Sequence, residues 1–272
     1  MELRNKVVVI TGSGGGLGEA CARRFTTEGA KVVVTDIDAG GVERVSESIG
    51  SVGLAADITV EANVEAVADL ARGAYGEIDL WFSNAGYAGS RQPGELQGND
   101  LWDRTWNLHV MSHVYATRAV LPAMLARGDG YLMQTASVVA LAAQADKAAY
   151  SVTKHAALAL AEWLALTFRP KGIKVSCFCP GPMLTPMLLA NDYPPDHPVL
   201  RAALTPEEVA GLLVASIRQE RFLILDSDAG ESSLRAKAAN YEKWLTDMSA
   251  VFSAPDLDGT VASGLRPSDP TR

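Results

Sequence analysis

Tyr150 and Lys154 stand four positions apart, so on a helix their side chains would lie on one face. A tyrosine phenol ordinarily ionises at about pH 10, which is too high for a general acid or base at neutral pH. A nearby ammonium group favours the phenolate and would lower the phenol pKa. The pair is therefore a candidate for moving a proton to or from a substrate oxygen. Because this spacing also arises by chance, it needs support from elsewhere in the chain.

A glycine-rich segment, Thr11-Gly12-Ser13-Gly14-Gly15-Gly16-Leu17-Gly18, directly follows a short apolar segment and opens a helical pattern. Glycine lets the backbone turn sharply and approach a pyrophosphate, whose charge would then lie at the free N–H groups of the helix N-terminus. A glycine-rich turn without a ligand is the alternative. The position between a strand and a helix favours a dinucleotide-binding loop.

The second apolar segment ends in Thr35-Asp36, where an acidic residue could accept hydrogen bonds from the adenosine ribose hydroxyls of a dinucleotide. A 2′-phosphate would meet this carboxylate at close range. Residues 12 to 18 contain no Arg or Lys, and the next basic residue after Asp36 is Arg44 in the following helical pattern. The sequence therefore favours NAD over NADP.

Apolar segments of strand length alternate with longer helical patterns, and they occupy residues 7–10, 32–34, 53–56, 78–82, 130–133, 175–178 and 222–225. Continuous apolar strands are typical of a parallel sheet that is covered by helices on both faces. The pattern predicts an α/β protein with a Rossmann-type, doubly wound parallel sheet of about seven strands.

The chain has 272 residues, a formal net charge of −8 and a mean hydropathy of +0.07, which indicate a soluble globular protein. The negative charge disfavours nucleic acid and anionic membranes as partners, and no apolar stretch reaches the length of a membrane span. No secretory signal is evident, and three cysteines without C-x-x-C spacing fit a reducing compartment. We therefore expect a cytoplasmic protein with no nucleic-acid partner.

Two segments interrupt the alternation of strands and helices. Residues 183–204 are rich in Met, Leu and Pro, which predicts a lid over a site. Residues 231–252 carry an apolar stripe and predict an extra C-terminal helix, which would cover the substrate pocket, a partner subunit or the sheet edge. We expect one domain over residues 1–253 and a disordered tail over residues 254–272.

Five motifs occur in order along the chain: Thr11-Gly12-x-x-x-Gly16-x-Gly18, Asn84-Ala85-Gly86, Asn107, Ser137 with Tyr150-x-x-x-Lys154, and Pro180-Gly181 with Thr185. With these motifs, residues 5 to about 225 resemble the short-chain dehydrogenase/reductase family. The sequence departs from the family pattern at Ser83, where a second Asn is usual. It also lacks the usual Thr-Gly before the last strand and the Asp-Gly-Gly after it.

The resemblance implies that Asn107, Ser137, Tyr150 and Lys154 are catalytic. Hydride transfer between a carbinol carbon and nicotinamide must be matched by proton movement at the oxygen, which is the role of Tyr150. Ser137 would hydrogen-bond the substrate oxygen. Lys154 would hold the nicotinamide ribose and, through a water kept by Asn107, relay protons to solvent.

By the same resemblance, Asp57 with the Ile58 backbone would hold the adenine, Asn84 and Gly86 the adenosine ribose side, and Thr185 the carboxamide. Asp57 could alternatively cap the following helix. The predicted cofactor-binding residues are Gly12, Ser13, Gly16, Leu17, Gly18, Asp36, Ile37, Asp57, Ile58, Asn84, Ala85, Gly86, Tyr150, Lys154, Pro180, Gly181 and Thr185.

The lid composition favours a small apolar alcohol or ketone as substrate, because a charged substrate would need paired basic residues. The predicted substrate residues are Val138, Val139, Met183, Met187 and Leu188. The sequence thus predicts an NAD(H)-dependent oxidoreductase that interconverts a secondary alcohol and a ketone. The alternative is a catalytically idle, dinucleotide-sensing binding protein of the same fold.

His109 and His113 also stand four apart, but no Cys or carboxylate completes a metal-ligand pattern beside them. We interpret them as surface or packing residues and predict no metal site. We expect the protein to assemble as a homodimer or homotetramer.

Overall fold

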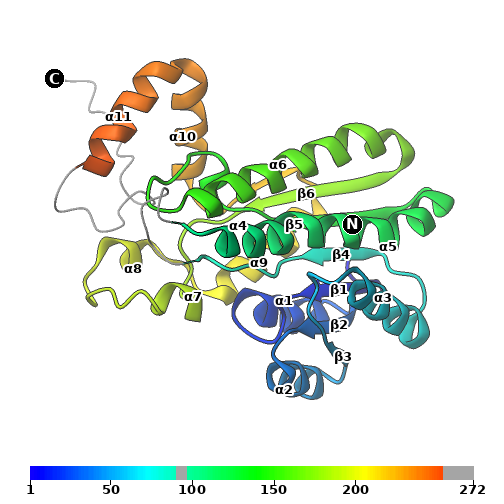
Figure 1. Ribbon diagram of the computed structural model, residues 1–272. Helices are drawn as coiled ribbons and strands as arrows, with labels where there is room; N and C mark the ends of the chain where they lie inside the picture. The colour runs from blue at the N-terminus through cyan, green and yellow to red at the C-terminus, as the bar shows by residue number, and fades with distance from the viewer. Residues whose placement is uncertain (90–96, 254–272) are drawn as a thin grey trace.

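The computed structural model describes residues 1–89 and 97–253 (Figure 1). Seven strands form one sheet in the order β3-β2-β1-β4-β5-β6-β7, and every pairing in it is parallel. The strands are β1 (Val7–Thr11), β2 (Lys31–Asp36), β3 (Val52–Ala55), β4 (Leu80–Ser83), β5 (Gly130–Thr135), β6 (Ile173–Cys179) and β7 (Leu223–Leu225). The predicted doubly wound sheet of seven strands is confirmed.

Helices cover both faces of this sheet (Figure 1). The α-helices are α1 (Gly16–Thr27), α2 (Ala39–Ile49), α3 (Glu61–Tyr75), α4 (Asn99–Trp106), α5 (Ser112–Arg127), α6 (Ala148–Phe168), α7 (Pro186–Leu189), α8 (Pro198–Ala202), α9 (Pro206–Arg218), α10 (Asp228–Ala239) and α11 (Tyr241–Ser253). A π-helical turn, η2 (Asn107–Met111), and two short 3₁₀ turns, η3 (Val138–Ala140) and η4 (Arg169–Lys171), complete the described elements.

Strand β1 shows why apolar and polar residues do not alternate in the predicted strands. Its five residues are all buried, because successive side chains point to opposite faces and each face has its own core. Val7 and Val9 pack with residues of α3, α5 and α6, whereas Val8 and Ile10 pack with residues of α1, α2 and α9. A strand between two helical layers therefore reads as uninterrupted Val and Ile.

The strand order reverses at β1, which pairs with β2 on one side and with β4 on the other. The connections after β1 and β4 leave the sheet in opposite directions, so a crevice opens between them at the carboxyl ends of the strands. Apart from Asn107, which begins η2, the predicted functional segments follow strand ends at this edge or lie on α6. The topology thus places the site before any side chain is considered.

The predicted single helix over residues 231–252 is two helices, α10 and α11, separated at Asn240. The Asn240 backbone is extended, with φ −156° and ψ 98°, and its side-chain oxygen accepts a hydrogen bond from the Lys243 backbone N–H at 2.9 Å. Asparagine competes with helix hydrogen bonds in this way and begins new helices well.

The break divides the predicted apolar stripe. Trp244 and Met248 are buried, but Leu234, Tyr241 and Leu245 are exposed. Ala238 is exposed as well, and the side chain of Phe252 lies outside the described residues. Because the chain changes direction at Asn240, the helical spacing does not continue from one helix to the next. The stripe is therefore not one continuous buried face, as its spacing had predicted.

The predicted lid, residues 183–204, contains the short helices α7 and α8 joined by irregular backbone, and a bridge between Met183 and Leu204 closes its base. It lies at the same end of the molecule as α10 and α11 (Figure 1). The predicted tail, residues 254–272, lies outside the described residues. In the described parts of the chain, no helix is both long and apolar enough to cross a membrane.

Candidate active site

Two adjoining cavities lie along the carboxyl edge of the sheet. The larger, about 540 Å³, is called here the crevice cavity and follows the ends of β1 to β6. The smaller, about 200 Å³, is called the lid cavity and is bounded by the lid, α10 and α11. Both cavities are lined by Tyr150, Pro180, Met183, Thr185 and Met187. Tyr150 therefore stands where the two cavities meet.

The crevice cavity is lined by every predicted cofactor-binding residue except Ser13 and Gly181. Ser13 is fully buried beneath the glycine loop, where its hydroxyl donates to the Ile10 carbonyl at 2.7 Å and accepts from the Thr35 N–H. It therefore joins β1 to β2, and its side chain does not face the cavity. Gly181 lines the lid cavity instead.

Asp36 holds the glycine loop in addition to lining the crevice cavity. One of its carboxylate oxygens accepts a hydrogen bond from the Gly14 N–H at 3.0 Å, and the other accepts from the Asp38 N–H at 3.1 Å. An acidic residue here thus fixes the loop and presents negative charge at the rim of the cavity.

The structure brings one basic residue closer to the loop than the sequence suggested. The Arg44 guanidinium donates to the Gly14 carbonyl at 2.8 Å and pairs with the Glu19 carboxylate at 2.7 Å. The lack of Arg and Lys in residues 12 to 18 therefore does not leave the loop without a nearby cation, as the sequence had suggested. Hydrogen bonding to Arg44 lowers the pKa of Glu19, so the pair stays ionised and the charge of Arg44 is balanced.

Asp57 and Ile58 line the crevice cavity just beyond β3. The Asp57 carboxylate accepts hydrogen bonds from the N–H and the hydroxyl of Thr59 at 2.9 and 2.7 Å. These bonds form a turn before α3, whose N-cap is Val60. The alternative prediction, Asp57 as the helix N-cap, is therefore wrong.

Asn84 joins the ends of three strands. Its side-chain nitrogen donates to the Thr11 carbonyl at 3.1 Å, and its oxygen accepts from the Thr135 hydroxyl at 3.3 Å. The Thr11 hydroxyl in turn accepts from the N–H groups of Asn84 and Ala85. Ala85 and Gly86, which follow Asn84 in the chain, line the crevice cavity.

Tyr150 and Ser137 form the centre of the site. Burial raises the pKa of the Tyr150 phenol, and a hydrogen bond to the Ser137 hydroxyl opposes that rise. Lys154 lies with its Nζ atom 5.7 Å from the centre of the Tyr150 ring. Burial is the largest influence on the phenol pKa, so the four-residue spacing of Tyr150 and Lys154 does not by itself place that pKa below its ordinary value.

Lys154 is buried, with 2% of its surface exposed, and its ammonium donates to the Thr135 carbonyl at 2.9 Å. Burial lowers the pKa of Lys154 to about 8. A buried ammonium with one carbonyl partner has donors left for a ligand in the crevice cavity, which it lines.

His109 and His113 are completely buried beside Lys154, so they are packing and not surface residues. His109 Nε2 accepts from the Tyr87 N–H at 3.1 Å, which leaves Nδ1 to donate to the Thr153 hydroxyl at 2.9 Å. The ring also meets the Tyr150 ring edge to face, with 5.5 Å between centres. His109 thus ties the segment after β4 to the helix that carries Tyr150.

We expect stability to fall as the pH drops below 6.5. Burial and the Lys154 charge lower the pKa of both His109 and His113, that of His113 to about 3. Their neutral form is favoured in the folded state, whereas the unfolded chain binds protons below about pH 6.5. The two neutral histidines therefore contribute fully to the free energy of unfolding above that pH. Protonation of His113 in the unfolded chain alone would reduce this free energy by about 2 kcal/mol at pH 5.

Urea unfolding of the wild type and His113→Gln between pH 5 and 8 measures this effect. We expect the stability of the variant to change less over that range, because one buried histidine is gone. Equal changes in the two proteins would contradict the prediction.

Asn107 begins the π-helical turn between α4 and α5, and its carbonyl accepts from the Ser112 N–H five residues later. Such a turn widens the helix locally and is frequent at functional sites. Asn107 is exposed and lines the crevice cavity together with Leu108 and Arg104. The predicted water relay from Lys154 through Asn107 stays a prediction.

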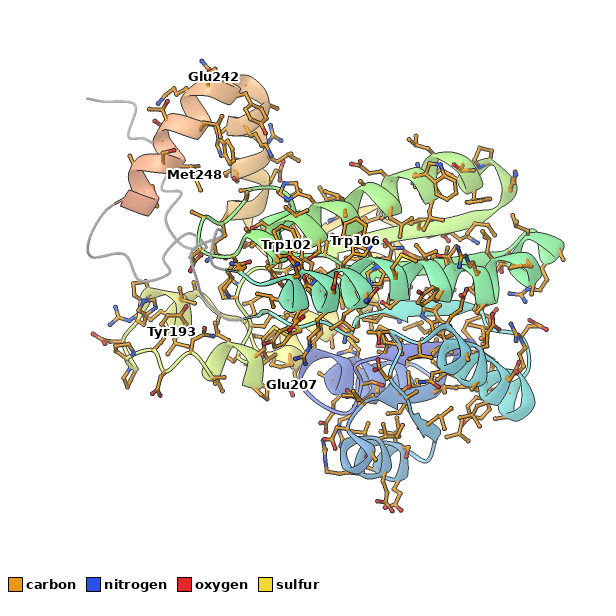
Figure 2. All side chains as sticks on the ribbon, viewed as in Figure 1. Trp102, Trp106, Tyr193, Glu207, Glu242 and Met248 are labelled. Atoms are coloured by element: carbon orange, nitrogen blue, oxygen red, sulfur yellow. The ribbon has the colours of Figure 1, made fainter. Side chains whose placement is uncertain are left out.

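The lid cavity contains all five predicted substrate residues, Val138, Val139, Met183, Met187 and Leu188. It also contains residues that the sequence analysis missed, among them Gln144, Lys147, Ser233 and Met248. Figure 2 shows Met248 on α11 and Tyr193 in the lid at the same end of the molecule, and both line this cavity. The C-terminal helices therefore cover the chain's own lid cavity.

Asp226, just after β7, is a further residue that sequence reasoning missed. Its carboxylate accepts from the Gly181 N–H at 2.9 Å, and burial raises its pKa. This contact holds the Pro180-Gly181 turn at the point where the lid begins. Its position directly after a predicted strand could have indicated it, because the site lies at the carboxyl edge of the sheet.

A family model described as short chain dehydrogenase matches residues 6–193. The 1-deoxy-11-beta-hydroxypentalenate dehydrogenase of Streptomyces exfoliatus is 32% identical, over 86% of this chain and 88% of that protein. The cyclohexanol dehydrogenase of Acinetobacter sp. (strain SE19) is 28% identical, over 83% and 93% of the two chains. A short chain dehydrogenase/reductase of Burkholderia phymatum, crystallised with NAD, superposes with a TM-score of 0.81 at 28% identity, over 89% and 96%.

These relatives agree with the predicted class of enzyme, an oxidoreductase, and the NAD complex supports the predicted cofactor. The family match begins before β1 and includes the glycine loop, Ser137, Tyr150 and Lys154. With this match and its similarity to named dehydrogenases over most of its length, the protein belongs to the short-chain dehydrogenase/reductase family.

Proposed function

We propose that the protein is an NAD(H)-dependent oxidoreductase that interconverts an apolar secondary alcohol and the corresponding ketone. The observation that carries this proposal is the position of Tyr150 at the junction of the two cavities, beside Ser137 and in front of the buried Lys154. A substrate oxygen in the lid cavity could reach the phenol there while the crevice cavity holds the dinucleotide.

The residues present fit a dinucleotide. At Gly15, which lines the crevice cavity, an added Cβ would meet nothing within 4 Å, so the loop leaves room for a pyrophosphate. Asp36 offers a carboxylate at the rim for ribose hydroxyls, and Lys154 offers unused donors further along the cavity. When bound, NAD supplies the hydride acceptor for alcohol oxidation.

In the proposed oxidation, the Tyr150 phenolate accepts the proton of the substrate hydroxyl as the hydride leaves the carbinol carbon. The Ser137 hydroxyl holds the substrate oxygen and stabilises the charge on it. The Lys154 ammonium favours the phenolate together with the positive charge of the oxidised cofactor, and so offsets the burial that raises the pKa of Tyr150. In ketone reduction, Tyr150 returns the proton.

An apolar substrate is supported by the Met and Leu residues of the lid cavity and by the cyclohexanol dehydrogenase among the relatives. A panel of lipophilic secondary alcohols with NAD, followed by the absorbance of the reduced nicotinamide, tests the proposal. The idle, dinucleotide-sensing alternative expects NADH binding without turnover of any alcohol or ketone. The presence of Ser137, Tyr150 and Lys154 favours the enzyme.

We expect Asp36→Asn to shift preference from NAD towards NADP by roughly ten- to hundredfold, because it removes a charge that repels a 2′-phosphate. The amide oxygen of asparagine can still accept from the Gly14 N–H, so the loop keeps this hydrogen bond. The ratio of kcat/KM for the two cofactors measures the shift.

Asp38→Asn is the matched control, because Asp38 carries the same charge two residues away and is no part of the crevice cavity. Its side chain accepts from the Gly40 N–H, a hydrogen bond that asparagine also makes. An equal shift in both variants would show that net charge, and not Asp36, sets the preference.

We also propose that the protein assembles as a homodimer or homotetramer and that it is cytoplasmic. Exposed apolar side chains on α6, Val152, Trp163 and Leu166, share one face of the helix next to an apolar groove against α5. If copies of the chain meet through this face, light scattering should show a smaller species for Leu166→Glu than for the wild type. An unchanged mass would place the interface elsewhere.

A further inference from the structure

Ser233 is a polar residue buried in the wall of the lid cavity. It lies on α10 with 4% of its surface exposed, and its hydroxyl has no hydrogen-bond partner among the residues that the structure describes. Within that part of the chain, no other residue that lines the lid cavity has a buried side-chain polar atom without a partner. Because leaving a buried hydroxyl unpaired is unfavourable, such a group in a binding cavity points to a polar atom of the ligand.

Helix α10 holds Ser233 in place from both sides. One turn before it, Gly230 packs so closely that an added Cβ would lie 3.3 Å from both Val138 and Leu225. One turn after it, the Lys237 ammonium donates to the Leu141 carbonyl at 3.2 Å. The hydroxyl is thus carried by a helix that is anchored to the segment directly following Ser137.

Apolar side chains dominate the wall around Ser233. Ala229, Gly230 and Met248 come from the two C-terminal helices, and Met187, Leu188 and Val199 come from the lid. The Asn191 side chain of the lid is already engaged with the carbonyls of Met187 and Leu188. The cavity therefore joins Ser137 and Tyr150, with Gln144 and Lys147 also in its lining, to apolar side chains of the lid and to one buried hydroxyl on a different element.

We propose that Ser233 is a second polar anchor for the substrate, which deepens the proposed function and rests on it. The substrate is then an apolar secondary alcohol or ketone with a second neutral oxygen, a hydroxyl or carbonyl, away from the reacting carbon. A serine hydroxyl can donate to either group and accept from a hydroxyl. A carboxylate is disfavoured because it would need paired basic side chains: among the described residues that line this cavity Lys147 is the one cation, and Lys237 on α10 is bound to the Leu141 carbonyl outside it.

The helix that carries Ser233 lies beyond residues 6–193, the segment that matches the family model. The usual family ending is also absent from this chain. The second anchor is therefore a specificity feature of this protein's own C-terminal helices, separate from the reaction centre.

The test compares matched alcohols with and without a second oxygen. The pairs are cyclohexanol with the 1,2-, 1,3- and 1,4-cyclohexanediols, and 4-cyclohexylcyclohexanol with 4,4′-bicyclohexanol. We expect wild type with NAD to have a higher kcat/KM for at least one diol than for its mono-alcohol. Ser233→Ala should lower kcat/KM for that diol by about five- to thirtyfold. It should change kcat/KM for the mono-alcohol by less than twofold.

Ser232→Ala is the matched control, because Ser232 is the exposed neighbour on the same helix. Ser232→Ala should leave kcat/KM unchanged for both the diol and the mono-alcohol. Equal losses for diol and mono-alcohol in Ser233→Ala would make Ser233 structural and overturn the proposal, as would an unchanged diol preference or the lack of any such preference in wild type. A carboxylated cyclohexanol that outperforms every diol would also overturn it.

Calorimetric binding of the same pairs to the protein with NADH separates this proposal from the proposed function. No turnover of any alcohol would contradict the proposed oxidoreductase activity. Tighter binding of a diol that is lost in Ser233→Ala would still support the anchor, and equal binding of diol and mono-alcohol would still overturn it.

Discussion

Replacing Tyr150 with phenylalanine is expected to lower kcat by about 10²- to 10⁴-fold, the usual effect of removing a positioned general acid or base. The ring keeps its packing against His109, and only the phenol oxygen is lost. NADH affinity should stay within about twofold, because the hydroxyl acts on the substrate oxygen and the loop that would hold the pyrophosphate is unchanged.

Steady-state kinetics and a fluorescence titration with NADH measure the two quantities. Tyr115→Phe is the control, since it removes a phenol from a half-buried tyrosine that packs on the core away from both cavities. A Tyr150→Phe protein that loses NADH affinity and turnover to the same extent would assign Tyr150 a structural role.

Replacing Gly18 with alanine is expected to abolish tight NADH binding, with an affinity at least 100-fold lower, and to reduce the free energy of unfolding by about 3 kcal/mol or more. An added Cβ would lie 2.0 Å from the Gly12 carbonyl oxygen and 2.7 Å from the Ser13 Cα. Both are backbone atoms, so the loop and α1 must move apart. The loop would then no longer follow the path that leads the backbone along the crevice cavity.

Two further glycine-to-alanine variants separate an effect on protein stability from a direct effect on cofactor binding. At Gly73, on the exposed side of α3, nothing lies within 4 Å, so alanine should raise helix stability slightly and leave NADH affinity unchanged. At Gly15 the protein also leaves room, so stability should be unchanged while a bound pyrophosphate would meet the new methyl group. Wild-type NADH affinity in Gly15→Ala would mean that the cofactor does not pass this residue.

The order and type of the strands could be predicted because the signal is local and repeated. Val7 to Ile10 are buried on both sides, so their hydrophobicity alone indicates a strand between two helical layers. The glycine loop could be predicted for a similar reason. A strand, a turn and a helix follow each other there without interruption, and Gly12 and Gly18 meet within seven residues.

The grouping of Ser137, Tyr150 and Lys154 was also predictable, but from resemblance combined with topology. Ser137 follows β5, and α6 packs against η3 and β6, so parallel strands bring both segments to one edge of the sheet. Spacing alone did not give the charge state of Tyr150. Its pKa depends on how much water the neighbouring elements exclude, and burial raises it here.

Other features of the site depend on contacts between residues far apart in the chain. Arg44 meets Gly14 because α2 packs beside the loop, although thirty residues separate them. Met248 of α11 joins Ser233 of α10 in the lining of the lid cavity because the chain changes direction at Asn240, a change that helical spacing does not record. The fold and the family could be read from local patterns and motif order, and the same motifs supplied the candidate catalytic residues Ser137, Tyr150 and Lys154. The burial of Tyr150, the contact of Arg44 with the loop and the position of Ser233 in the lid cavity depend on how the helices and strands pack. That packing is fixed only when all of them are in place.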